Sequence, residues 1–212
     1  MTALTEKIKQ EKIIAIIRGL SLDEIVKTAE ALEKSGIHFI EVTFNQKGNS
    51  ADTYYAIKRL VREFPHVKIG AGTVITENQV EMAFDAGAEY IISPNVNEKV
   101  IQMTKKSGMI SIPGAMTPSE MVNAYECGAD IVKLFPAGQL GVSYIKSISA
   151  PLNYIPIAAV GGINLENIME FFRAGVCCVG LGANIVRTDY VKEENYRAIT
   201  ELAKSYVQMV RG

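Results

Sequence analysis

Several features that mark particular classes of protein are missing from this chain of 212 residues. No apolar run approaches the roughly 20 residues that a membrane-spanning helix needs. The opening segment, MTALTEKIKQEK, carries too many charges for a secretory signal. Basic residues number 22 and acidic residues 23, so no excess of charge points to nucleic acid. We therefore expect a cytoplasmic protein that binds neither membranes nor nucleic acids.

Cysteine and histidine are also scarce. The three cysteines, Cys127, Cys177 and Cys178, form no CxxC pair, and the adjacent two lie in the apolar run VCCVGLG, where a free cysteine behaves as a small hydrophobe. The only histidines, His38 and His66, lie at or before the start of predicted strands and supply no set of metal ligands. We expect neither disulfides nor a metal, and no cofactor.

Short β-branched runs alternate with longer amphipathic stretches along the whole chain. This alternation predicts a parallel sheet with helical crossovers. The amphipathic stretches open on a Ser or Thr cap and close on Gly, as in SLDEIVKTAEALEKSG at 21–36. The eight predicted strands are residues 13–17, 37–44, 67–71, 89–93, 109–113, 130–135, 155–160 and 177–182.

Eight such units predict a single α/β domain over residues 1–212, a (β/α)8 TIM barrel with a short helix before the first strand. The alternative is an open, doubly wound sheet. That fold usually has fewer strands at this length and carries a glycine-rich nucleotide loop at its first turn. The first turn here, Arg18–Gly19–Leu20, contains no GxGxxG motif, so the barrel is favoured.

Polar and special residues gather at the predicted carboxyl ends of the strands, where barrel enzymes place their catalytic groups. Thr73, Pro94, Pro113 and Lys133 follow one another at intervals of 21, 19 and 20 residues, so one strand and one helix fit each interval. This spacing predicts that these residues lie around one rim of the barrel.

Lys133 interrupts the apolar run IVKLF. A lysine is almost never fully buried without a reason. In a structural interpretation, its aliphatic stem follows the apolar surface and its ammonium group reaches the barrel mouth or an ion pair. In a catalytic interpretation, apolar surroundings disfavour the ammonium form, lower the pKa and leave a neutral amine that forms a Schiff base with a carbonyl.

Glu41 is a second polar residue in a largely apolar strand, IHFIEVTF. It could merely neutralise a nearby cation inside the barrel. Its functional interpretation is a general acid and base, whose proton affinity is set by partial burial and a neighbouring lysine. A lysine and a glutamate together are what carbinolamine formation, dehydration and C–C cleavage need.

Glycines end the last two predicted strands, in Gly161–Gly162–Ile163–Asn164 and in Gly180–Leu181–Gly182–Ala183–Asn184. Close packing of strand and helix would explain either group alone. The loops after strands 7 and 8 of such a barrel are, however, its usual phosphate site, because exposed backbone N–H groups and a helix dipole attract an anion. The two groups together favour an anion site.

Six strings, in chain order, resemble those of the bacterial 2-keto-3-deoxy-6-phosphogluconate (KDPG) and 4-hydroxy-2-oxoglutarate (KHG) aldolases. They are EVTF (41–44), GAGTV (70–74), ISP (92–94), IPGAMTPSE (112–120), VKLFPA (132–137) and GGIN (161–164). The resemblance covers nearly the whole chain. The resemblance implies a class I aldolase on a (β/α)8 barrel that makes a Schiff base with pyruvate, needs no metal and forms a homotrimer.

The resemblance also assigns roles to individual residues. It implies that Lys133 forms the Schiff base and that Glu41 is the general acid and base. Thr73 would hold the pyruvate carboxylate, while Pro94 and Phe135 would line the pyruvyl pocket.

Three positions depart from many relatives. Asn45 follows EVTF where relatives carry an arginine that grips the pyruvate carboxylate, and Arg18 could supply the missing cation. Val160 and Ala183 stand where relatives carry a threonine and a serine, so two hydroxyl groups beside the anion site are lost. The preference for a 6-phosphate is therefore an open question, with Gly161, Gly162, Gly182 and Ala183 left to bind it.

The sequence thus predicts a lyase that cleaves a KDPG-type or KHG-type keto acid to pyruvate and an aldehyde, glyceraldehyde 3-phosphate or glyoxylate. A phosphate-binding isomerase or epimerase on the same barrel, with no covalent lysine, is the rival enzyme. A keto-acid sensor without catalysis is the rival outside enzymology. The aldehyde and the stereochemistry at C4 remain open.

Overall fold

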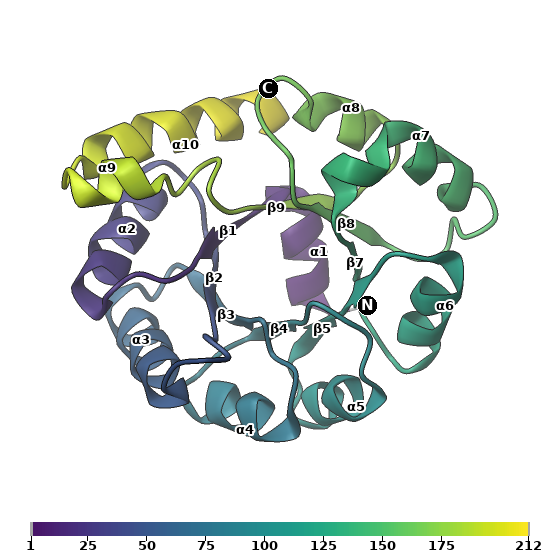
Figure 1. The fold of residues 1–212 in the computed structure, drawn as a ribbon, viewed down its shortest axis with the longest axis horizontal. Coiled ribbons are helices and arrows are strands. Elements are labelled where there is room, and N and C mark those ends of the chain that lie inside the picture. The colour runs from purple at the N-terminus through teal and green to yellow at the C-terminus, as the bar shows by residue number, and fades with distance from the viewer. Residues whose placement is uncertain (1, 212) are drawn as a thin grey trace.

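A computed structural model describes residues 2–211, and its strands form one sheet wrapped into a ring (Figure 1). All eight strand pairs are parallel, in the order β5-β4-β3-β2-β1-β9-β8-β7-β6. The strands are β1 (Ile13–Ile17), β2 (Phe39–Thr43), β3 (Lys68–Gly72), β4 (Tyr90–Ile92), β5 (Ile110–Ile112), β6 (Gly114–Ala115), β7 (Val132–Leu134), β8 (Ile157–Val160) and β9 (Cys178–Leu181). The predicted barrel is confirmed, and the open sheet is excluded.

Within residues 2–211 the barrel has nine strands rather than the predicted eight, because a two-residue strand, β6, follows Pro113, the residue at which the predicted fifth strand ends. A proline has no N–H to donate, so the ladder cannot continue through it. Before it, Ser93 N donates to Ile112 O on the β4 side, and after it Phe135 N donates to Ala115 O on the β7 side. The segment before Pro113 therefore pairs with β4, the segment after it pairs with β7, and together they close the ring.

Helices surround the strands on the outside of the ring (Figure 1). They include the predicted capped helices, and at the start of α6 Thr117 N donates to Glu120 Oε2 while Glu120 N donates to Thr117 Oγ1. None of the helices within residues 2–211 has the length and apolar character needed to cross a membrane. The outer helices are α2 (Leu22–Lys34), α3 (Ser50–Glu63), α4 (Glu77–Asp85), α5 (Glu98–Lys106), α6 (Pro118–Glu126), α7 (Ala137–Ser149), α8 (Ile168–Arg173), α9 (Thr188–Lys192) and α10 (Tyr196–Arg211).

The predicted N-terminal helix, α1 (Ala3–Glu11), lies across the opening of the ring (Figure 1). It leads directly into β1, so it covers the amino ends of the strands, and its Ile8 is 1% exposed. Ile8 belongs to an apolar cluster inside the barrel whose other buried members are Ile14, Phe39, Tyr90, Ile92, Ile110, Ile112, Ile131, Ala158 and Cys178. Apolar side chains thus fill the barrel on the side of α1, and the carboxyl ends of the strands are left to form a site.

Candidate active site

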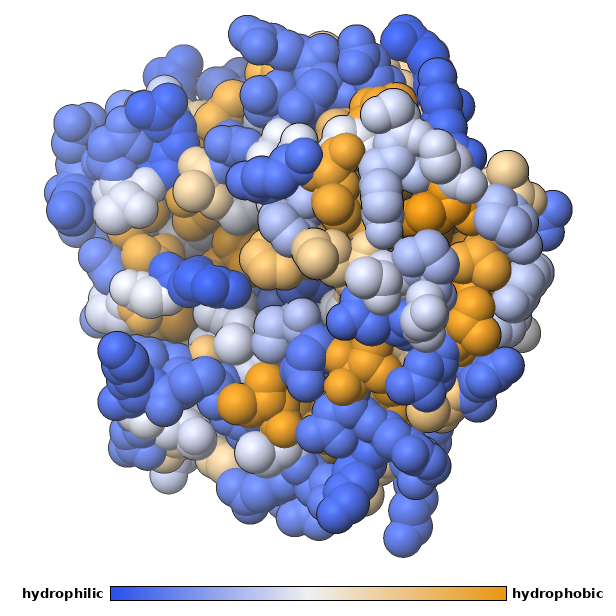
Figure 2. Space-filling view, turned by 45° about the vertical axis from the view of Figure 1, so that its right-hand side comes forward, coloured by the Kyte–Doolittle hydropathy of each residue, from blue (hydrophilic) through white to orange (hydrophobic). Residues whose placement is uncertain are grey.

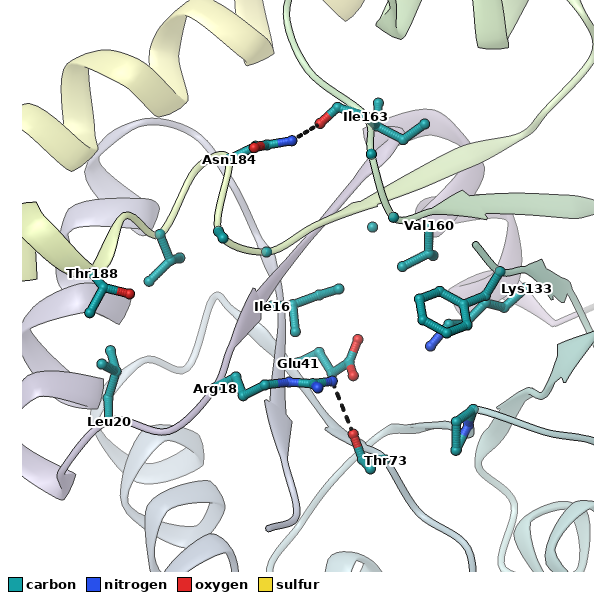
Figure 3. Close-up of a pocket in the computed structure, with 18 residues that line it drawn as sticks. Ile16, Arg18, Leu20, Glu41, Thr73, Lys133, Val160, Ile163, Asn184 and Thr188 are labelled. Carbon is teal, nitrogen blue, oxygen red and sulfur yellow. Dashed lines mark hydrogen bonds between the residues drawn. The ribbon is translucent and has the colours of Figure 1, made fainter. Parts of the chain in front are cut away.

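A cavity of about 630 Å³ lies at the carboxyl ends of the strands (Figure 3). All ten residues that the sequence predicts for the site line it, together with eight others. The ten are Arg18, Glu41, Thr73, Pro94, Lys133, Phe135, Gly161, Gly162, Gly182 and Ala183. Residues from most of the strands therefore meet in one place, as the barrel predicts.

Lys133 lies at the centre of β7 and is 6% exposed. Its Nζ atom lies 4.9 Å from the centre of the Phe135 ring. Burial lowers the pKa of this amine; Glu41 opposes that shift and Arg18 adds to it. The structure thus buries the lysine in an environment that favours the neutral, nucleophilic amine.

Glu41 lies on β2, is 2% exposed and points into the same cavity as Lys133 (Figure 3). Burial raises the pKa of its carboxyl group, and the positive charges of Lys133 and Arg18 oppose that shift. No ion pair with an N···O distance of 4.0 Å or less joins it to Lys133 in the described chain. The carboxyl group is thus close enough to influence the amine, without a direct ion pair.

Arg18 follows β1 and reaches across the cavity mouth, where its Nη2 atom donates a 3.3 Å hydrogen bond to Thr73 Oγ1 (Figure 3). The two side chains therefore form one polar wall of the site. A guanidinium group and a hydroxyl group can together hold a carboxylate. Arg18 thus lies where it could supply the cation that Asn45 does not.

Thr73 has an unusual backbone, with φ at +56°. This left-handed region is strained for a β-branched residue. Two glutamines support the strained segment: Gln46 Nε2 donates to Thr73 O at 2.6 Å, and Gln79 Nε2 donates to Gln46 Oε1 at 3.1 Å. Gln79 also accepts a hydrogen bond from Ile75 N, so its amide is fixed at both ends. Sequence reasoning missed this pair.

The glycine loops after β8 and β9 form the wall opposite Arg18 and Thr73 (Figure 3). The loops are joined by a 2.5 Å hydrogen bond from Asn184 Nδ2 to Ile163 O. Gly161 and Gly162 have φ of +90° and +76°, a region that favours glycine. Asn164 Oδ1 accepts from Glu166 N and Asn167 N in the turn before α8, and Asn164 O accepts from Ile168 N at the first position of α8. An anion here would therefore depend on the loops more than on that helix.

The far end of the cavity contains residues that the sequence did not single out. Figure 3 labels three of them: Leu20 after β1, Asn184 in the loop after β9, and Thr188 at the start of α9. The fourth is Val186, also in the loop after β9. Asn184 is the last residue of the second glycine motif and could have been included among the site residues. The others have no local signal, because irregular loops bring them to the site. Within residues 2–211, no three His, Cys, Asp or Glu side chains gather as a metal site would require.

Comparison with known proteins agrees with this geometry. The family model described as "KDPG and KHG aldolase" matches residues 4–202. A protein of Rhizobium meliloti (strain 1021), described as a probable 2-dehydro-3-deoxy-6-phosphogalactonate aldolase, is 37% identical over 92% of this chain and 91% of its own. The 2-dehydro-3-deoxy-6-phosphogalactonate aldolase of Escherichia coli (strain K12) is 32% identical over 94% of this chain and 96% of its own.

A solved structure shares both the fold and the sequence pattern. It is the KDPG aldolase of Legionella pneumophila, with pyruvate captured at low pH as a covalent carbinolamine intermediate. It is 33% identical to this chain, covers 96% of it and 98% of its own length, and has a TM-score of 0.87. The chain therefore belongs to the KDPG and KHG aldolase family, and it is a class I pyruvate aldolase, a carbon–carbon lyase.

Proposed function

We propose that this aldolase reversibly cleaves a 2-keto-3-deoxy-6-phospho sugar acid to pyruvate and glyceraldehyde 3-phosphate, with Lys133 as the Schiff-base residue and Glu41 as the general acid and base. The observation that carries the proposal is the pairing of a buried amine with a buried carboxyl group in one cavity. The amine is 6% exposed and the carboxyl group 2% exposed. Both environments favour the neutral forms that acid–base and imine chemistry use.

The first half of the reaction joins the substrate to the enzyme. The neutral Nζ of Lys133 attacks the C2 carbonyl, forming a carbinolamine. Glu41 gives a proton to the departing hydroxyl group, which leaves as water and produces a protonated imine. Because this imine carries a positive charge next to C3, it can accept the electron pair of a breaking bond.

The second half breaks the carbon–carbon bond. Ionised Glu41 takes the proton of the C4 hydroxyl group, the C3–C4 bond breaks, and the aldehyde leaves. The bonding electrons move into the imine and give an enamine. Protonation at C3 and hydrolysis then release pyruvate and regenerate the amine. A positioned acid and base of this kind is worth about 10²–10⁴-fold in rate.

The two walls of the cavity support one direction for the bound substrate. Arg18 and Thr73 would hold the carboxylate at C1, Pro94 and Phe135 would pack around the pyruvyl group, and the phosphate would lie between the glycine loops after β8 and β9. Those loops contain Gly161, Gly162, Gly182 and Ala183.

The proposed configuration at C4 is supported by the relatives. The relatives at 37% and 32% identity are both described as acting on the 6-phosphogalactonate epimer. We propose the galactonate epimer as the better substrate, with the gluconate epimer and 4-hydroxy-2-oxoglutarate as weaker ones. Steady-state kinetics on all three compounds test this ranking, and a larger kcat/KM for the gluconate epimer would contradict it.

Covalent trapping tests the chemistry. Borohydride added with pyruvate should reduce the imine and increase the protein mass by one reduced pyruvyl group on Lys133. Lys133→Ala should lose both the label and the cleavage activity. Lys204, an exposed lysine of α10, gives a matched control, because Lys204→Ala should keep both. An unchanged mass of the wild-type protein would overturn the Schiff-base mechanism.

We also propose that the chain assembles as a homotrimer and works in the cytoplasm. Exposed apolar side chains on neighbouring helices support association, with Tyr55 60% and Phe84 51% exposed. Three free cysteines, Cys127, Cys177 and Cys178, suit a reducing compartment. Light scattering on the purified protein should give three times the mass of 23.2 kDa, and a monomer would contradict the assembly.

A further inference from the structure

A tyrosine lies inside the barrel beside the catalytic carboxyl group. Tyr90, the first residue of β4, is 0% exposed. It lies level with Glu41, because Glu41 of β2 and Tyr90 of β4 both pair in register with Gly70 on the intervening strand β3. Only one strand therefore separates the two residues.

Two glycines of β3 give both side chains the space that they occupy. A Cβ atom on Gly70 would overlap the Tyr90 ring, including the carbon that bears the hydroxyl group. A Cβ atom on Gly72 would overlap the Glu41 carboxylate. The phenol thus extends from β4 across Gly70 toward β2, while Glu41 leans from β2 toward Gly72. Both polar groups therefore converge on the inner face of β3.

Both groups contain an atom without a hydrogen bond. Within residues 2–211, neither the Tyr90 hydroxyl oxygen nor Glu41 Oε2 has a partner, although both atoms are buried. A buried polar atom without a partner is costly and uncommon. A phenol that needs an acceptor beside a carboxylate that needs a donor can satisfy both needs at once.

We propose that the Tyr90 hydroxyl group donates a hydrogen bond to Glu41 during the reaction cycle, directly or through one water molecule, and so positions that carboxylate. Tyr90 is a positioning residue, because it acts through Glu41 and does not touch the reacting atoms. This proposal rests on the proposed role of Glu41 as general acid and base. It also gives the tyrosine hydroxyl a function that the packing of its ring does not require.

The charges around Tyr90 and Glu41 set the direction in which the pKa of Glu41 should move when the tyrosine hydroxyl group is removed. Glu41 faces Lys133 of β7 and Arg18 after β1, and burial raises the pKa of its carboxyl group. Burial also raises the pKa of the Tyr90 phenol, with Glu41, Glu89 and Cys178 adding to that shift, so the phenol keeps its proton and can donate it. A donor stabilises the ionised carboxylate, so loss of the hydroxyl group should raise the pKa of Glu41 further.

Tyr90→Phe tests the proposal, because it removes the hydroxyl group and keeps the ring over Gly70. The acid limb of the kcat/KM profile should move to higher pH by about one unit, the worth of one hydrogen bond to a charged group. At neutral pH kcat should fall by roughly 3- to 30-fold, with the KM for pyruvate in the condensation direction nearly unchanged. Tyr125→Phe, which removes the hydroxyl group of a half-buried tyrosine on α6, should leave the profile unchanged.

A double-mutant cycle with Glu41→Gln shows whether Tyr90 acts through Glu41. In the Glu41→Gln background, Tyr90→Phe should lower kcat by less than about twofold, because the carboxylate that its hydroxyl group would bind is already lost. A Tyr90→Phe enzyme with a wild-type acid limb, or one whose full loss persists in the Glu41→Gln background, would overturn the role of Tyr90 alone. A Glu41→Gln enzyme with wild-type rate would overturn the proposed role of Glu41 and the tyrosine's role with it.

Discussion

Gln46 holds the backbone of Thr73 in place: its amide donates a 2.6 Å hydrogen bond to the carbonyl of a residue whose φ is +56°. This contact comes from the loop after β2, the one that follows Glu41 along the chain. It fixes the direction in which the Thr73 hydroxyl faces Arg18. The loop after β2 thus sets the geometry of Thr73, the residue that directly follows β3.

Gln46→Ala should therefore weaken binding of the pyruvate carboxylate. We expect the KM for pyruvate in the condensation direction to rise by about 3- to 10-fold, which corresponds to loss of one hydrogen bond. The change in kcat should be small, because the alanine leaves Lys133 and Glu41 in place. Gln102→Ala, which removes an exposed amide on α5 bonded to Glu98, is the matched control. Equal KM values for the two variants would show that Thr73 keeps its conformation without Gln46.

Arg18→Leu should raise the KM for pyruvate more than Gln46→Ala does. A guanidinium group gives a carboxylate a charge-assisted partner, and hydrogen bonds to charged groups are worth about 1.5–3 kcal/mol. The KM for pyruvate should thus rise roughly 10- to 100-fold. Arg59→Leu, on the outer helix α3, should leave it unchanged. Unchanged affinity in Arg18→Leu would mean that Thr73 and backbone donors suffice.

The rate of borohydride trapping should report the pKa of Lys133. Because burial lowers that pKa, the rate should rise with pH and level off below 10.5, the ordinary value for lysine. Glu41 raises the pKa of Lys133 and Arg18 lowers it, so Glu41→Gln should move the inflection to lower pH and Arg18→Leu to higher pH. Shifts in the same direction for both variants would contradict this electrostatic account.

The double variant Val160→Thr, Ala183→Ser should sharpen the preference for a phosphorylated substrate. Each restored hydroxyl group could add a hydrogen bond to the phosphate, worth about 1.5–3 kcal/mol. The kcat/KM ratio between phosphorylated and unphosphorylated substrates should therefore widen by at least about tenfold. A flat ratio would mean that the distal end of the substrate does not lie between the loops after β8 and β9.

The positions of the strands and the convergence of the site residues could be predicted, because barrel strands are short apolar runs whose carboxyl ends share one rim. Strand β6 was missed, because it is only two residues long and lies beyond Pro113, where the predicted fifth strand ends. The pair Gln46 and Gln79 could not be predicted, since their contact spans 33 residues and depends on how two loops fold. Tyr90 could not be predicted as a site residue either, because in the sequence it is one more aromatic residue of a buried strand.

Helix α1 has a consequence for the order of events in catalysis. Because α1 closes the amino end of the barrel, the cavity opens only at the carboxyl ends of the strands, and the substrate and both products must use that entrance. In the proposed mechanism, Lys133 keeps the pyruvyl group bonded until the imine is hydrolysed, so the aldehyde departs first, and pyruvate enters first in the reverse direction. Because α1 closes the other end, both products pass the same rim of strand carboxyl ends in that order, whatever the aldehyde.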